Sequence, residues 1–134
     1  MSDTKKPSSI SEFKGELRDL KQVSMERLVE IADSVGFQIS ERVKMNQIRR
    51  FLDGARKVEA EVKRSKQFDQ VKDRIVLLRP KLAYAAGRNA DVKPLAELLD
   101  AAVTSAAKSE ENFKKFLRLM EGIIAYHRYH GGRD

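Results

Sequence analysis

The side chains best placed to do chemistry in this sequence are Lys and Arg residues between positions 41 and 66. They fall into two rows, each with a period of seven residues: Arg42, Arg49, Arg56 and Lys63 in the first, and Arg50, Lys57 and Arg64 in the second. A seven-residue period keeps side chains on one face of a helix. Cations arranged in rows along a helix face bind phosphates and other polyanions. The pattern therefore predicts a surface that binds a polyanion.

Apolar residues at helical spacing predict that 41–66 is one helix, starting as late as Asn46, a good N-cap residue. Ile48, Phe51, Leu52, Ala55, Val58 and Val62 form its apolar stripe. We expect both cation rows opposite that stripe. Gly54 lowers helix stability by about 1 kcal/mol relative to Ala, which is tolerable if another group approaches the backbone there.

A solvated surface helix is the alternative interpretation, because Lys and Arg are good helix formers that are rarely buried. The charge distribution favours binding instead. Residues 41–90 hold 14 of the 27 Lys and Arg but 6 of the 20 Asp and Glu, whereas the rest of the chain holds 13 against 14. Clustered cations bind polyanions by displacing their counterions. A membrane surface or an acidic protein could use the same patch, and charge alone does not separate these partners.

The sequence gives no support for catalysis. It contains no Cys, which excludes disulfides and thiolate metal sites, and no Gly-rich phosphate loop lies between a strand and a helix. His127 and His130 could hold a metal only with ligands from elsewhere. His127 lies on an apolar stripe, where a core or interface histidine is the commoner role. We predict no catalytic site, no metal and no cofactor.

The flanking segments are predicted to be helical. Residues 1–9 are polar and expected to form a mobile tail, with Ser9 and Glu12 resembling a capping box. Residues 10–35 form one helix or two, with any break at 22–24. Gly36 is a natural stop, followed by a connector at 37–40.

Prolines and glycines divide the second half of the chain. Pro80 predicts a break near 78–79, and Gly87 is expected to end that helix. Pro94 suits the first turn of the next helix, and Ser109 is a candidate N-cap of the last one, which Gly131 and Gly132 terminate. No stretch shows strand alternation. We therefore predict an all-α protein, a compact bundle of five to six helices in one domain over 10–134.

No apolar run approaches membrane-spanning length, and the N-terminus lacks the apolar core of a signal peptide. These features predict a cytoplasmic protein without a membrane partner. Aromatic residues do not interleave with the cation rows, so contact with a nucleic-acid backbone is favoured over base stacking.

Three motifs together resemble one family. They are QIRRF at 47–51, LRPKLAYAAGR at 78–88 and IAYHRYHGG at 124–132. The combination is similar to the small helical subunit of type III-A CRISPR-associated effector (Csm) complexes, over roughly residues 24–132. The family commonly opens its long basic helix with Thr or Ser, where this chain has Met45 and Asn46.

The resemblance implies a non-catalytic subunit in antiviral defence. Several copies would stack along the filament of backbone subunits, contact guide and target RNA without reading sequence, and neighbour the large subunit. Arg49, Lys81 and Arg88 lie within the matching motifs. The helical wheel adds a second set of RNA-binding candidates: Arg42, Arg50, Arg56, Lys57, Lys63 and Arg64.

Two alternatives stay open at this point. Arg88 follows a helix-ending glycine, so a C-cap or an ion pair is nearly as well supported as RNA contact. The whole chain could also be a protein-interaction module whose basic helix docks an acidic partner. Residues 126–130 are expected to pack in the core or against a neighbour.

Overall fold

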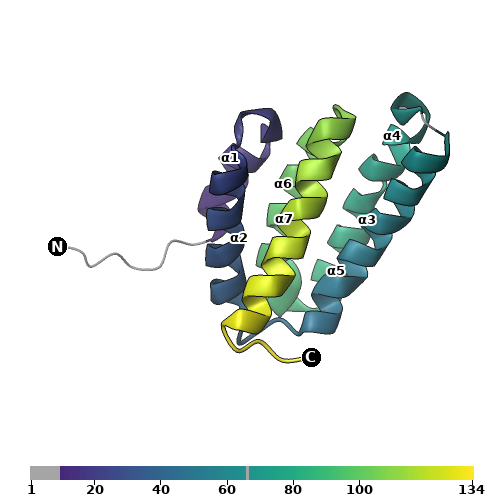
Figure 1. The fold of residues 1–134 in the computed structure, drawn as a ribbon. Coiled ribbons are helices and arrows are strands. Elements are labelled where there is room, and N and C mark those ends of the chain that lie inside the picture. The colour runs from purple at the N-terminus through teal and green to yellow at the C-terminus, as the bar shows by residue number, and fades with distance from the viewer. Residues whose placement is uncertain (1–9, 66) are drawn as a thin grey trace.

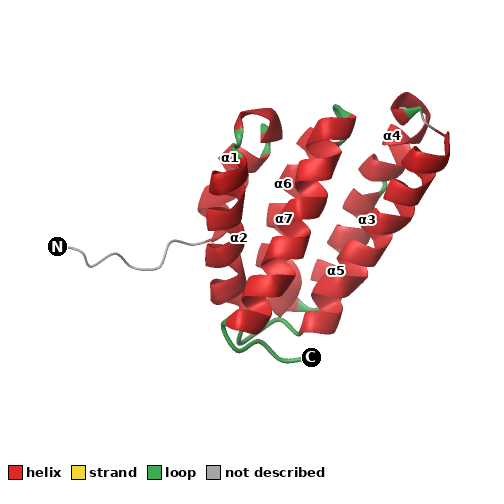
Figure 2. Ribbon diagram, in the orientation of Figure 1, coloured by secondary structure: helices red, strands yellow, loops and turns green. Residues whose placement is uncertain are grey.

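The computed structural model describes residues 10–65 and 67–134, and the regular structure in these ranges is helical, without a strand (Figure 2). Six helices have nine residues or more: α2 (Met25–Ile39), α3 (Met45–Ser65), α4 (Phe68–Val76), α5 (Leu78–Arg88), α6 (Lys93–Ala106) and α7 (Glu110–Tyr129). Four short helical turns complete the fold: η1 (Ile10–Phe13), α1 (Lys14–Leu17), η2 (Leu20–Gln22) and η3 (Ala90–Val92). The predicted all-α bundle is confirmed. The predicted tail at 1–9, with Ser9 of the capping box, lies outside the described residues.

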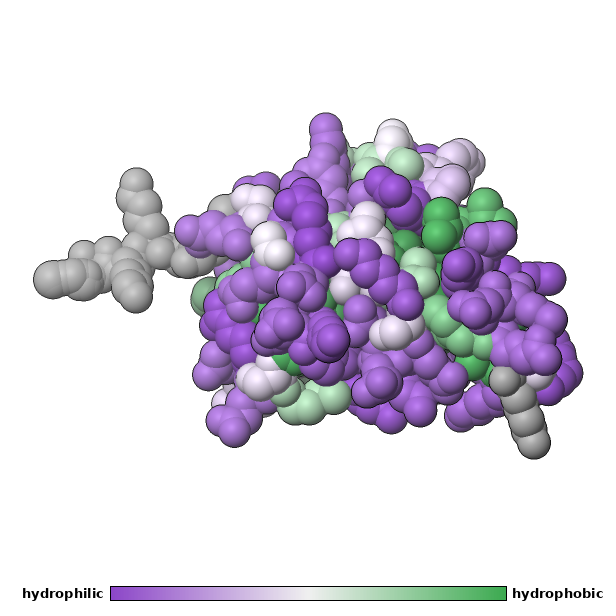
Figure 3. Space-filling view, turned by 90° about the horizontal axis from the view of Figure 1, so that it is seen from above, coloured by the Kyte–Doolittle hydropathy of each residue, from purple (hydrophilic) through white to green (hydrophobic). Residues whose placement is uncertain are grey.

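The helices form two layers that meet along α6 and α7 (Figure 1). In the front layer α7 lies between α2 and α3, and in the back layer α6 lies between α1 and α5. Both central helices bury the apolar faces that their sequences predict, including Leu98 and Leu99 of α6 and Phe113 and Phe116 of α7. Viewed from above, the surface is mostly hydrophilic, and hydrophobic side chains gather mainly on the side of α3 and α4 (Figure 3). The basic helix α3 is thus an edge helix with one face against α7.

The predicted helix starts at Ser109 and Pro94 are confirmed. The Ser109 side chain accepts a hydrogen bond from the Asn112 N–H at 3.1 Å, and Pro94 lies in the first turn of α6. Residues 10–35 form separate pieces, because the chain leaves the helical conformation at Val23 and Ser24. Arg27 of α2 ties them together through two hydrogen bonds to the Glu16 carboxylate of α1. This pairing with Arg27 holds the pKa of Glu16 below its ordinary value.

Gly36 does not end α2, contrary to the sequence prediction. The helix continues to Ile39, and most of the predicted connector at 37–40 is therefore helical. Gly36 serves close packing instead, since a Cβ at this position would lie 2.7 Å from the His127 backbone nitrogen and 2.8 Å from the Tyr126 Cβ. The absence of a side chain lets α2 contact α7 directly.

The basic helix begins at Met45, so the predicted start at residue 41 and the predicted cap at Asn46 are both wrong. The Lys44 N–H donates to the Gln47 side chain at 3.0 Å, and the Met45 N–H donates to the Arg133 carbonyl at 2.8 Å. These two hydrogen bonds satisfy backbone N–H groups at the start of the helix, which therefore begins one residue before Asn46. Arg42 consequently lies in the turn between α2 and α3, off the helix.

Pro80 and Gly87 act differently from each other. The break predicted near 78–79 occurs at Leu77, so Pro80 falls in the first turn of α5, where its missing N–H needs no partner. Gly87 does not end α5, which continues to Arg88 and stops at Asn89. The Asn89 side chain accepts a hydrogen bond from the Asp91 N–H, which starts the next turn.

Gly131, which follows α7, is the glycine with a positive φ among the described residues.

Gly36→Ala is expected to destabilise the protein by about 1–3 kcal/mol, because the new methyl group overlaps the α7 backbone. Gly87→Ala is the matched control, since nothing lies within 4 Å of its added Cβ and Ala is the better helix former by up to about 1 kcal/mol. Urea denaturation followed by circular dichroism measures both. Equal effects of the two substitutions would contradict the proposed role of Gly36.

Candidate nucleic-acid interface

The two cation rows of α3 face different directions, and the prediction that both lie opposite the apolar stripe is wrong. Ile48, Leu52, Ala55, Val58 and Val62 are buried. At 100° per residue, Arg49, Arg56 and Lys63 lie about 60–100° around the helix from Ile48, and Arg50, Lys57 and Arg64 lie about 160–200° from it. The first row flanks the contact with α7, and the second points away from the protein.

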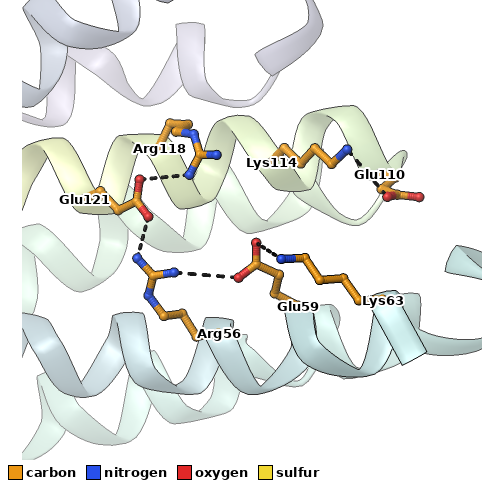
Figure 4. A network of polar contacts seen from close by, with 7 residues as sticks. All are labelled: Arg56, Glu59, Lys63, Glu110, Lys114, Arg118 and Glu121. Carbon is orange, nitrogen blue, oxygen red and sulfur yellow. Dashed lines mark hydrogen bonds and ion pairs between the residues drawn. The ribbon is translucent and has the colours of Figure 1, made fainter. Parts of the chain in front are cut away.

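Acidic side chains neutralise part of the first row (Figure 4). Arg56 forms an ion pair with Glu121 of α7, which also pairs with Arg118, and Arg56 lies 3.7 Å from Glu59. Lys63 lies 3.8 Å from the other oxygen of Glu59. The network joins α3 to α7 across the surface of the front layer (Figure 4). Arg56 and Lys63 therefore have internal partners and are less available to an external anion.

Sequence reasoning gave no role to Glu59 or Glu121. Glu59 lies three residues after Arg56 and four before Lys63, a spacing that predicts ion pairs on one helix. Its contacts could therefore have been predicted. Glu121 carries no such signal, because it lies 65 residues from Arg56 and reaches it only through the packing of α7 on α3.

The cations of the second row have no partners among the described residues. Arg50, Lys57 and Arg64 are exposed, and none makes an ion pair or side-chain hydrogen bond with a residue that the structure describes. The same holds for Arg49 on the flank of α3 and for Arg42 in the preceding turn. These cations are free to meet phosphates, and little rearrangement of the protein would be needed.

The α5 cations differ in their surroundings. Lys81 lines a small hollow together with Arg50, so the fold brings this predicted residue next to the second row. Arg88 lies in the last turn of α5, with its guanidinium 5.9 Å from the centre of the Tyr84 ring. Arg79 is held by Asp100 of α6 at 2.7 Å, and this hydrogen bond raises the pKa of Arg79.

The two histidines point to different places. His127 is fully buried and donates from Nε2 to the Val43 carbonyl at 2.5 Å, while His130 lies 2.6 Å from Asp33 of α2. His127 is therefore a core residue, and its bond fixes the turn before α3. No group of three or more His, Asp or Glu in the described ranges is placed to hold a metal ion. No helix of the same ranges is both long and apolar enough to cross a membrane.

Comparison with known families decides the relationship. The family model described as Csm2 Type III-A matches residues 22–133. The chain belongs to the Csm2 family of type III-A CRISPR systems. This confirms the resemblance inferred from the three motifs. A relative from Streptococcus thermophilus, named "CRISPR system Cms protein Csm2", is 34% identical to this chain over 74 residues. That match covers 53% of this chain and 60% of the relative.

In this Csm2-family chain, Arg56 has ion-pair partners and the adjacent Lys57 has none. Neutralising these two neighbouring residues of α3 should therefore change the free energy of unfolding by different amounts. Arg56→Gln is expected to lower the free energy of unfolding by up to about 1 kcal/mol, less at high salt, because it loses two half-exposed ion pairs. Lys57→Gln has no such partner to lose and should change stability by less than about 0.5 kcal/mol. Urea denaturation at low and high salt measures both. A larger loss of unfolding free energy for Lys57→Gln than for Arg56→Gln would contradict the assignment of Arg56 as the paired residue and Lys57 as the unpaired one.

Proposed function

We propose that this chain is a non-catalytic, RNA-binding structural subunit of a type III-A CRISPR ribonucleoprotein complex, acting in antiviral defence in the cytoplasm. Membership of the Csm2 family supports the assignment to such a complex. The observation that carries the RNA-binding part is the outward row of α3, whose three cations are exposed and without partners in the described structure. Lys81 extends this surface onto α5.

The spacing of the row fits a nucleic-acid backbone. Seven residues of α helix span about 10 Å, so Arg50, Lys57 and Arg64 form a track about 20 Å long. Between Arg50 and Arg64 the sequence holds no Asn or Gln, and its one aromatic residue, Phe51, is half-buried. Contact with phosphates without reading of sequence follows. Guide–target base pairing would supply the specificity, and both RNA strands are candidate ligands.

The opposite edge of the front layer has another character. Met25, Val29 and Phe37 of α2 are large apolar residues with about half of their surface exposed. Helix α2 lies on the far side of α7 from α3 (Figure 1). We assign contacts with neighbouring copies, with the backbone subunits and with the large subunit to surfaces away from the α3 track. Repetition of a weak RNA site along a filament would multiply its affinity.

Neutralising the track should reduce RNA binding in a defined way. The triple variant Arg50→Gln, Lys57→Gln and Arg64→Gln removes up to three phosphate contacts. The slope of log affinity against log salt should then become shallower by about 2, because each contact with a single strand contributes about 0.7. Fluorescence anisotropy of the purified chain with labelled single-stranded and duplex RNA, over a salt series, measures the slope.

A control triple variant, Arg18→Gln, Lys21→Gln and Lys108→Gln, makes the same change in net charge. These cations are exposed and lie outside 41–90. The control should keep the wild-type slope if the track itself binds RNA. Equal losses in the two triple variants would show a general charge effect, and absence of wild-type binding at low salt would contradict the proposed function.

An acidic protein partner on the same basic helix is the second candidate. Its motivating observation is the same outward row. Copurification of the assembled complex, before and after RNase treatment, separates the two. Protein docking would be favoured if the partners stay bound after RNase treatment but dissociate in high salt. The track variant should then also fail to retain them.

A further inference from the structure

A small hollow opens between α3 and α5, beside the outward cation row. Its volume is about 40 Å³, and its lining is almost wholly apolar. Its lining includes Phe51 of α3, Leu78 of α5, and Phe116 and Met120 of α7. These four side chains are buried or half-buried. The hollow is therefore an apolar feature beside exposed cations.

Gly54 is part of the lining of this hollow. Glycine in the middle of a 21-residue helix lowers helix stability relative to Ala. Close packing does not require a glycine here, because a Cβ at Gly54 would lie 3.6 Å from Leu78 Cδ2, an ordinary contact. Gly36 differs in this respect, since its Cβ would overlap α7. At Gly54, a large side chain would instead occupy the hollow.

Two free cations flank the opening. Arg50 of α3 and Lys81 of α5 both line the hollow, are exposed, and make no ion pair with a described residue. A ligand that is apolar at its centre and anionic on both sides complements this arrangement. A nucleotide within an RNA strand has this chemistry, since a flat base is joined to a backbone with a phosphate on either side.

We propose that the hollow receives the edge of one unpaired RNA base, while Arg50 and Lys81 hold the adjoining phosphates. The inference rests on the proposed function and names the form of RNA that the site prefers. In a continuous duplex the bases are paired and stacked inside, so none can enter the hollow. The surface therefore favours single-stranded or locally unpaired RNA, without preference among bases, because the lining offers apolar contact and no hydrogen-bond pattern.

The test compares two single strands of equal length and charge, an RNA oligonucleotide and the same ribose-phosphate chain without bases. Anisotropy over a salt series measures both affinities with the purified chain. Wild type should bind the base-bearing strand about fivefold more tightly, the factor that about 1 kcal/mol of base contact gives. Equal affinities would overturn the inference without the need for any variant.

Gly54→Leu, which fills the hollow and leaves every charge in place, should abolish this fivefold difference and keep the salt slope. Gly54→Ala is the matched control and should keep more of the difference than Gly54→Leu, since its single methyl group meets only Leu78 Cδ2, at an ordinary 3.6 Å. Circular dichroism verifies that both variants remain helical. Retention of the difference in a helical Gly54→Leu variant would overturn the inference. Failure of the proposed function itself is distinct, because neither strand would then bind in a salt-dependent way.

Discussion

The close approach of α2 to α7 is the contact on which the rest of the bundle depends. Gly36 lies against the α7 backbone, and Gly122 lies against Ala32, where an added Cβ would be 2.8 Å from the alanine methyl group. Small residues on both helices therefore set the separation of the two backbones. The contact also brings His130 to Asp33. Helix α7 also packs against α3 and α6, so its contact with α2 fixes the position of both layers.

The start of α3 is fixed by the far end of the chain. His127 donates to the Val43 carbonyl, and Arg133 accepts from the Met45 N–H. Gly132 covers the His127 ring so closely that an added Cβ would lie 2.1 Å from its Cε1 atom. The chain after α7 thus determines which residues of the basic segment become helical. Arg42 is excluded from the helix for this reason.

The fold divides the basic residues of α3 into two groups. Arg56 and Lys63 flank the α7 contact and lie beside carboxylates, and Arg56 links the two helices through Glu121, whereas Arg49 on the same flank makes no such pair with a described residue. Cations on the outward face, such as Lys57, keep their charge free for an external partner. Exposed ion pairs add little to stability. Their larger effect here is to leave unpaired positive charge on the outward face of α3, next to α5 and the apolar hollow.

Local chemistry allowed much of this protein to be predicted from its sequence. Apolar periodicity gave the helices and their buried faces, Ser109 and Pro94 gave helix starts, and the three motifs gave the family. Contacts between distant residues decided the rest. Gly36 and Gly87 looked alike in sequence, yet only Gly36 meets another helix, and neither ends its own. The Glu121 partner of Arg56 and the neighbourhood of Arg50 and Lys81 arise only when α3 packs against α7 and α5, because helix packing, unlike helix formation, depends on residues far apart in the chain.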